Sequence, residues 1–332
     1  LESDKNSKMA VECTIKDNLI FIYGEATTKA KLDYEQIAKT VLKDIGYEED
    51  FKVIIQVSKQ SQEINKAVEK DELGAGDQGI MFGYASNETE EYMPLPILLA
   101  NKITMQLAKV RKEDKYSPLK PDGKSQVTVE YIDNIPKRID TIIIASQHIK
   151  DITHEELTKY IQENIIDKVI PTELVDNNTK ILINTSGSFV VGGPFGDSGT
   201  TGRKIVVDAY GGSAKVGGGC FSSKDPTKVD RSAAYMARFI AKNIVANGFA
   251  KKCEIQLSYA IGVAQPVSIY VDTFGTGKIP ENEIVKKIKN TFNLTPRGII
   301  TSLDLRRPIY KQTTNYGHFG KENLPWEKII KL

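Results

Sequence analysis

The order of apolar and polar positions along the chain occurs three times: a mostly apolar run, a loop, a stretch with helical spacing, and a second apolar run. In the first repeat, the helical stretch has apolar residues three and four positions apart, which places them along one side of a helix. These residues are Tyr34, Ile37, Ala38, Val41, Leu42 and Ile45. The pattern predicts strands at 19–28 and 51–60 on either side of a helix at 32–46, with this stripe facing inward.

The second repeat predicts strands at 138–148 and 180–187 and a helix at 153–170. Thr153 has Glu156 three positions after it, which is the pattern of a capping box at the start of a helix. The inward stripe of this helix consists of Leu157, Tyr160, Ile161, Ile165 and Val169. The capping pattern and the stripe therefore agree on where the helix begins.

The third repeat predicts strands at 266–277 and 298–305 and a helix at 280–292, with Pro280 in its first turn. The inward positions of this helix are Ile284, Val285, Ile288 and Phe292. Three such units predict an α+β fold of three similar domains, each a β-sheet with helices on one face. Since β-α-β order is common, the pattern alone leaves a coincidental similarity open.

Two longer stretches outside the repeats are also predicted helices, at 95–113 and at 231–248. Prolines stand near the start of the first. For the second, Asp230 or Ser232 is the predicted N-cap, and Gly248 lies just past the end.

The overall charge is nearly balanced, with 45 Lys and Arg against 43 Asp and Glu. A net charge of +2 gives no large field of one sign, so nucleic acid is excluded as a general partner and any anion site is local. Three cysteines without a CxxC pair and three scattered histidines make neither a zinc cluster nor a disulfide framework. No long uninterrupted apolar run is present, so we expect a cytoplasmic protein that does not enter a membrane.

Neither of two common nucleotide-binding motifs occurs in a suitable setting. "GAGDQG" at 74–79 matches the dinucleotide-binding pattern, yet a charged stretch precedes it and a strand-like run follows it, the reverse of what that site needs. No glycine is placed before a Gly-Lys-Ser/Thr as a P-loop requires. His148, His154 and His318 have no nucleophile nearby in the sequence and are interpreted as surface or packing residues.

Cationic residues on glycine- and serine-rich loops are the strongest chemical signal. The stretch "GGPFGDSGTTGRKIVVD" at 192–208 is the densest such loop. Small residues let a ligand approach the backbone, cations bind phosphate oxygens, and carboxylates bind Mg²⁺, so the pattern suggests a metal-bound polyphosphate. The cations are Lys124, Arg203, Lys204, Lys224 and Lys228, and the neighbouring acids are Asp122, Asp197, Asp225 and Asp230. Each lysine taken alone is equally consistent with a solvated surface residue, and Asp230 with a plain helix cap.

Several blocks resemble the signature motifs of the S-adenosylmethionine synthetase (methionine adenosyltransferase) family. They are "GEATT", "GAGDQGIMFGYA", "PDGKSQVTVEY", "FVVGGPFGDSGTTGRKIVVDAYGG", "GGGCFSSKDPTKVDRSAAYMAR" and "YGHFGKENLPWE", and they cover essentially the whole chain in the family's order. The resemblance implies synthesis of S-adenosylmethionine, diphosphate and phosphate from ATP, L-methionine and water. It also implies Mg²⁺, two ions per site, with K⁺, and a homodimer with active sites at the subunit interface, or a homotetramer.

The resemblance further implies that the three pseudo-symmetric domains are interleaved in sequence. The expected division is 1–60 plus 193–232 as a central domain, 88–192 as an N-terminal-type domain, and 67–87 plus 233–332 as a C-terminal domain. Residues 60–70 are expected to form a mobile gate loop over the site.

Site roles follow from the same resemblance. Lys124, Arg203, Lys204, Lys224 and Lys228 are expected to act on the triphosphate, with Lys228 at its junction with methionine. Asp122, Ser188, Phe189, Asp197 and Cys220 are expected to contact ATP. Glu25, Gln60, Asp197 and Lys228 are expected to bind methionine, Asp230 to bind Mg²⁺ and Glu12 to bind K⁺.

The sequence departs from the family pattern in three places. The family's His-Pro-Asp-Lys motif has no counterpart, and we expect it in residues that precede Leu1. "QSQEI" at 60–64 replaces a proline-containing "QSPDI", and Cys220 stands where alanine is common. Two interpretations therefore stay open: an active synthetase, or a noncatalytic regulatory or ligand-binding homologue that lacks the histidine motif.

Overall fold

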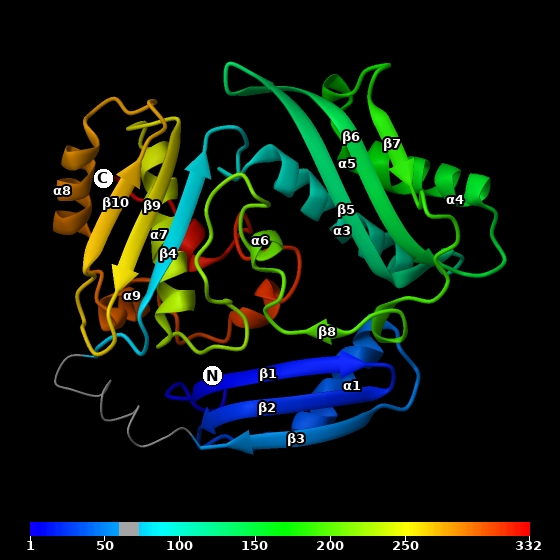
Figure 1. Ribbon diagram of the computed structural model, residues 1–332, viewed down its shortest axis with the longest axis horizontal. Helices are drawn as coiled ribbons and strands as arrows, with labels where there is room; N and C mark the ends of the chain where they lie inside the picture. The colour runs from blue at the N-terminus through cyan, green and yellow to red at the C-terminus, as the bar shows by residue number, and fades with distance from the viewer. Residues whose placement is uncertain (60–72) are drawn as a thin grey trace.

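A computed structural model describes residues 1–59 and 73–332 of the chain. It contains three sheets, with strand orders β3-β2-β1-β8, β10-β9-β4 and β5-β6-β7 (Figure 1). Each sheet has helices on one face, and the first two sheets combine strands that are distant in sequence. The prediction of an α+β fold with three similar, interleaved domains is confirmed. The domain boundaries given above stay a prediction.

The first sheet consists of β1 (Lys8–Lys16), β2 (Leu19–Thr27), β3 (Lys52–Ser58) and the short β8 (Gly199–Thr200). β1 and β2 are antiparallel, whereas β2 and β3 are parallel because the helix between them returns the chain to the same end. The two-residue strand β8 adds the glycine-rich loop to the edge of β1. This loop is therefore anchored to a sheet whose other strands lie more than 140 positions earlier in the chain.

Helix α1 (Tyr34–Ile45) covers the first sheet. Asp33 caps it by accepting a hydrogen bond from the Gln36 amide, and Gly46 ends it with φ of 111°, a conformation that favours glycine. Tyr34, Ala38 and Leu42 pack on the sheet, but Ile37 and Val41 are 50% and 47% exposed. The prediction that the whole stripe faces inward is wrong, because one sheet face is narrower than the six-residue stripe.

The second sheet consists of β4 (Gly79–Ser86), β9 (Lys252–Tyr259) and β10 (Ser268–Asp272), all antiparallel. Helix α7 (Val229–Ala246) lies on it and is buried along most of its length. The approach is close at Gly83, where a Cβ would lie 2.0 Å from the backbone of α7. Only glycine fits at that crossing.

Two predictions about this domain are wrong. Helix α7 begins at Val229 with Lys228 at its N-cap, so neither Asp230 nor Ser232 caps it. The predicted strand at 298–305 is helical in its first part, within α9 (Pro296–Ser302). The Thr295 hydroxyl accepts from the Gly298 amide and Pro296 occupies the first turn, so local helix-start signals prevail over a short apolar run that suits either structure.

The third sheet consists of β5 (Leu119–Ile132), β6 (Ile135–His148) and β7 (Lys180–Ile183). Helix α3 (Leu95–Glu113) spans the predicted range and packs on β5. Helix α4 (His154–Ile161) has the predicted capping box, with Thr153 and Glu156 bonded to each other's backbone amides. A π-helical turn and the short α5 continue it to Val169.

The remaining helices and 3₁₀ turns are shorter. They are α5 (Asp167–Val169), α6 (Ile205–Asp208), α8 (Glu281–Thr291), the π turn Gln162–Ile166, and the 3₁₀ turns Thr172–Leu174, Gly193–Phe195, Tyr310–Thr313 and Pro325–Glu327. None of the described helices is long and apolar enough to cross a membrane.

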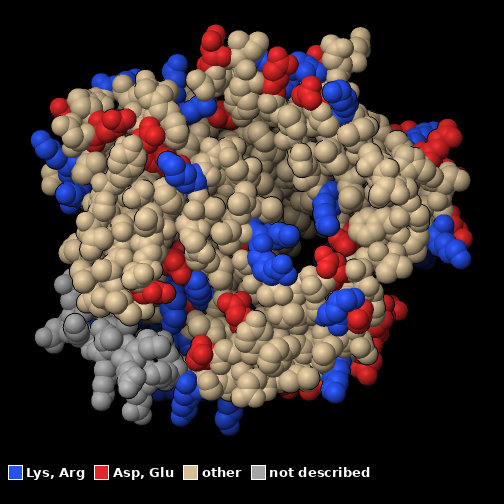
Figure 2. Space-filling model, viewed as in Figure 1, with Lys and Arg blue, Asp and Glu red and all other residues tan. Residues whose placement is uncertain are grey.

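In residues 1–59 and 73–332, each sheet leaves one face without a helix, and large apolar residues are exposed there. In Figure 1 the strands lie in front of α1, α3 and α7, so the three uncovered faces look toward the same side of the molecule. Exposed residues on these strands are Phe21, Ile54, Ile80, Leu182 and Tyr270. Figure 2 shows the same side largely free of charge over the sheets, with Lys and Arg side chains around a central hollow between α6 and β5.

Candidate functional site

The loop 222–225 holds Lys224 between the first sheet and α7. Asp225 and Met9 are joined in both directions, by the Asp225 amide to the Met9 carbonyl at 3.0 Å and by the Met9 amide to the Asp225 carboxylate at 2.9 Å. Ala10 and Lys224 form an isolated β-bridge. At the end of the Lys224 side chain, Nζ donates to Asp230 Oδ2 at 2.6 Å. The ammonium group is thereby oriented by contacts from β1 and from α7.

Asp225 fixes this loop from within. Its side chain is 3% exposed and accepts hydrogen bonds from Lys228 Nζ at 2.9 Å, from the Met9 amide and from the Thr227 amide. These three donors compensate the burial of a carboxylate. Lys228 immediately precedes α7, and its ammonium group donates a hydrogen bond to the Asp225 carboxylate.

Asp230 lies against glycines from two other segments. A Cβ on Gly219 would lie 2.1 Å from Asp230 Cγ, and a Cβ on Gly79 would lie 3.6 Å from its Oδ1. Gly79 is the last residue of "GAGDQG", and β4 begins there, so the motif lines the site although it is no dinucleotide site. The periodicity of the sequence did not connect this motif with Asp230. The family resemblance, which includes both this motif and the block around Asp230, is the signal that connects them.

Glu12 faces the same loop from β1. Its Oε1 accepts from the Ser223 hydroxyl at 2.7 Å, whereas its Oε2 is buried and has no hydrogen-bond partner among the described residues. A buried carboxylate oxygen without a partner is unfavourable unless a cation compensates it, so Glu12 fits the predicted K⁺ ligand. Glu25 lies on the same sheet face, because its partner Ala10 and Glu12 are two positions apart on one strand.

Asp122 and Phe189 lie together at the glycine-rich loop. Asp122 Oδ2 accepts from the Gly193 amide at 2.9 Å, and a Cβ on Gly192 would come within 3.1 Å of Asp122 Cβ and 3.0 Å of the Phe189 ring. Asp122 thus fixes the entrance of the loop "GGPFGD". His148 accepts from the Phe189 amide at 3.0 Å and is 5% exposed, which agrees with its interpretation as a packing residue.

Three predicted phosphate residues are exposed and unengaged. Within residues 1–59 and 73–332, the side chains of Lys124, Arg203 and Lys204 make no hydrogen bond or ion pair. Asp208, one helical turn after Lys204, has its pKa raised to about 6 by burial. Burial likewise lowers the pKa of the nearby Lys321 to about 8.

Other predicted residues are less informative. Ser188 and Asp197 are exposed, and the Asp197 carboxylate accepts only from the adjacent Ser198 amide among the described residues. Cys220 is half-buried against Gly202, where a Cβ would lie 2.5 Å from the Cys220 Cβ. Gln60 and all of the predicted gate loop 60–70 lie outside the described residues.

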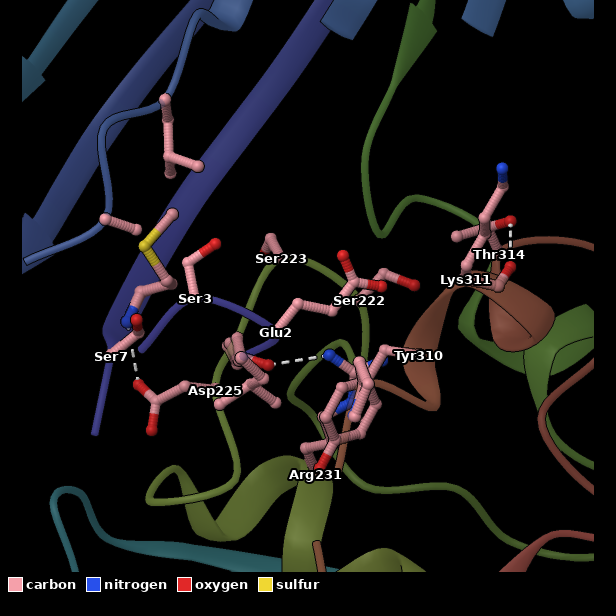
Figure 3. A pocket seen from close by; sticks show the side chains of 16 residues that line it. Glu2, Ser3, Ser7, Ser222, Ser223, Asp225, Arg231, Tyr310, Lys311 and Thr314 are labelled. Carbon is pink, nitrogen blue, oxygen red and sulfur yellow. Dashed lines mark hydrogen bonds between the residues drawn. The ribbon is translucent and has the colours of Figure 1, made fainter. Parts of the chain in front are cut away.

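Of the five predicted cations, Lys224 alone lines the cavity beside the loop 222–225 in the described part of the chain. A cavity of about 480 Å³ is lined by the loop 222–225, by Arg231 and Tyr310, and by residues near Leu1 (Figure 3). Lys224 belongs to its lining, whereas Lys124 and Arg203 do not. Within the described part of the chain, no three His, Cys, Asp or Glu side chains are grouped so that they alone would hold a metal. Mg²⁺ usually takes only one or two carboxylates besides phosphate and water, so Asp230 fits such a site.

Three family models match consecutive parts of the chain. The N-terminal domain of S-adenosylmethionine synthetase matches residues 1–71, the central domain matches 72–189, and the C-terminal domain matches 191–328. β8 lies within the residues that the C-terminal model matches, but it pairs with β1, which the N-terminal model matches. β4 lies within the central match, but it pairs with β9, which the C-terminal model matches. The three matches together leave only a few residues uncovered.

Proposed function

Because the chain belongs to the S-adenosylmethionine synthetase family, we propose that it is a methionine adenosyltransferase that converts ATP, L-methionine and water to S-adenosylmethionine, diphosphate and phosphate. The methionine sulfur attacks C5′ of the ribose in line. The C5′–O bond breaks and the triphosphate leaves whole. The triphosphate is then hydrolysed before it is released.

This reaction depends on stabilising a departing polyanion. A thioether is a neutral, weak nucleophile, and the step creates a sulfonium and a tripolyphosphate with several negative charges. Preplaced cations lower such a barrier because they interact more strongly with the transition state than with ATP. Positioning of sulfur and C5′ at attack distance supplies the rest.

The observation that carries the proposal is the state of Lys124, Arg203 and Lys204. These exposed side chains have no hydrogen-bond or ion-pair partner in residues 1–59 and 73–332, and Lys and Arg side chains surround the hollow in Figure 2. They are available for phosphate oxygens. Lys224, on the loop 222–225, and Lys228, bonded to Asp225 of that loop, complete the set of five.

The remaining groups are assigned by the same proposal. Asp230 would hold Mg²⁺, two ions of which are expected per site, and Glu12 would hold K⁺; when bound, these ions neutralise charge on phosphate oxygens and on the loop. Ser188, Phe189, Asp122 and Cys220 would contact the nucleoside end of ATP. Methionine would contact Glu25, Gln60, Asp197 and Lys228.

A second copy of this chain would complete the site. The uncovered sheet faces expose Phe21, Ile54 and Tyr270 on one side, and apolar faces of this kind are covered in stable assemblies. A homodimer with its active sites at the interface would bring the cations of one chain toward the loop of the other. Further pairing to a homotetramer, a gate at 60–70 and a cytoplasmic location belong to the same proposal.

The test is direct. The chain is mixed with ATP, L-methionine, Mg²⁺ and K⁺, and S-adenosylmethionine, phosphate and diphosphate are measured by chromatography. Stoichiometric formation of all three is expected. Binding of ATP or methionine without product would instead favour the noncatalytic homologue.

A further inference from the structure

Three buried side chains lie directly beneath the loop that carries Lys224. Arg231 and Tyr235 are on α7, and His318 comes from the segment before the C-terminal 3₁₀ turn. Arg231 is 5% exposed, and Tyr235 and His318 are completely buried. The sequence predicts no functional role for any of the three, and it suggests that His318 is a surface or packing residue.

Hydrogen bonds join the three side chains to one another and to the loop. The Tyr235 hydroxyl accepts from Arg231 Nε at 3.0 Å and is hydrogen-bonded to His318 Nδ1 at 2.8 Å. His318 Nε2 is in turn hydrogen-bonded to the Ser222 hydroxyl at 3.4 Å. The chain of bonds therefore begins beside Lys224 and returns to the loop at Ser222.

Arg231 also contacts the loop directly. Its Nη1 donates to the Lys224 carbonyl at 2.6 Å and its Nη2 donates to the Thr313 hydroxyl at 3.2 Å. The Tyr310 ring lies 4.0 Å from the guanidinium, and Figure 3 shows the two side chains against each other. Among the described residues no carboxylate pairs with Arg231, so its partners are neutral groups.

The loop needs such support. Ser223 has φ of 74°, a left-handed conformation that is strained for a residue with a side chain. Its hydroxyl is held by Glu12, while its neighbours Ser222 and Lys224 are held by His318 and Arg231. Burying an arginine charge without an ion pair is expensive, and an apolar side chain would fill the same space more favourably. The contribution of Arg231 therefore lies in the groups that it binds, above all the Lys224 carbonyl.

We propose that Arg231, Tyr235 and His318 are positioning residues that fix the backbone at 222–224 and thereby aim the Lys224 ammonium group at the substrate anion. This inference rests on the proposed function, in which Lys224 holds the triphosphate. In this proposal the three residues need no contact with the substrate or the reacting atoms. They act through the direction of one lysine side chain, so their removal affects the transition state more than the binding of substrate.

The experiment uses Tyr235→Phe, which removes the hydroxyl but keeps the ring stacked on Trp326 at 3.7 Å. Tyr259→Phe is the matched control, because Tyr259 is 2% exposed and, among the described residues, its hydroxyl bonds only to the Leu294 carbonyl, away from the loop. We expect kcat to fall about tenfold or more in the first variant, with KM values changed less than about threefold, and the control to keep kcat within about twofold. Equal kcat in the two variants would overturn the inference.

A second readout separates this inference from the proposed function. Hydrogen–deuterium exchange at the amides of 222–225 should rise in Tyr235→Phe and stay unchanged in Tyr259→Phe, whether or not S-adenosylmethionine is formed. If the unchanged protein makes no product, the proposed function fails, and exchange alone decides whether these residues hold the loop. If Tyr235→Phe does not fold, Thr313→Val removes a different acceptor of Arg231 and is judged by the same two measurements.

Discussion

The five cations fall into two groups that the fold treats differently. Lys224 and Lys228 have side chains 19% and 21% exposed, and each is ion-paired with an aspartate of its own segment. Lys124, Arg203 and Lys204 are exposed on glycine-rich or strand-edge positions and, in the part of the chain that the structure describes, have no such partner. The side chains of the first group are oriented before a ligand binds. The side chains of the second group can change conformation when a ligand binds.

This contrast separates two ways of holding an anion. A fixed, partly buried cation stabilises developing charge without reorganising, but its position must be maintained by many contacts. Water and salt screen an exposed cation, so each such cation contributes less to anion binding. It needs no supporting structure, however. We therefore expect mutations in the first group to affect folding and turnover, and mutations in the second to affect mainly ligand affinity.

The largest expected effect is on stability, from Asp225→Ala. The change removes the buried acceptor of Lys228, Met9 and Thr227, and loss of one partner from a buried pair costs about 3–5 kcal/mol. Urea denaturation measures the free energy of unfolding. Asp197→Ala is the control, since this exposed carboxylate bonds only to its neighbour's amide among the described residues, and it should stay within about 0.5 kcal/mol of the unchanged protein. Similar losses in the two variants would remove the distinction between fixed and free groups.

Lys224→Ala is expected to lower turnover strongly. Loss of one preplaced electrostatic donor reduces kcat by about 10²–10³-fold, because the ammonium group matters most while charge builds on the departing oxygen. Steady-state kinetics and calorimetric methionine binding together test this, and methionine affinity should change much less. A parallel loss of turnover and methionine affinity would contradict the role given to Lys224.

Arg203→Ala should leave stability unchanged and weaken anion binding. Its side chain has no partner within the described residues, so removing it breaks no contact there. Affinity for inorganic tripolyphosphate, measured by calorimetry at low salt, should fall about tenfold, since hydrogen bonds to charged groups contribute about 1.5–3 kcal/mol. Lys43→Ala, an exposed cation on α1, is the control and should bind normally. Equal affinity of the Arg203 and Lys43 variants would place Arg203 outside the site.

The smallest effect expected is a pH dependence of stability that originates at His318. Burial, with Arg231 and Lys321 nearby, holds the pKa of His318 well below its usual range. The unfolded chain takes up a proton at this residue below about pH 6.5 and the folded chain does not, so its contribution to stability is present above that pH and is lost as the pH falls.

Thermal unfolding between pH 7 and pH 5 measures this contribution. The unchanged protein should lose more stability over this range than His318→Gln does. The difference between the two proteins isolates His318, because Asp208, whose pKa burial raises to about 6, titrates in both. Parallel pH profiles would show that His318 does not bear this proton linkage.

Local patterns predicted those parts of the fold that depend on near neighbours. Helix α3 was expected at 95–113 and occupies that range, and the capping box at Thr153 is present as expected. The apolar spacing of the short run at 298–305 suits a strand or a helix, and Thr295 with Pro296 just before it starts the helix that the structure shows. Here the capping signal, and not the periodicity, determines the local structure.

The sequence by itself determined the family, the three-part α+β plan and which loops carry cations, since motifs, spacing and glycine content are local properties of the chain. Only the tertiary structure decided which cations are fixed and which are free, that Glu12 has an unpartnered buried oxygen, and that Arg231 and His318 support Lys224. The contacts of Glu12 and His318 join residues some 80 to more than 200 positions apart in sequence, as with Ser223 and Glu12 or Tyr235 and His318, whereas the ion pairs of Lys224 and Lys228 join residues six and three positions apart. No local spacing encodes such pairs, because they exist only once separate elements have packed together.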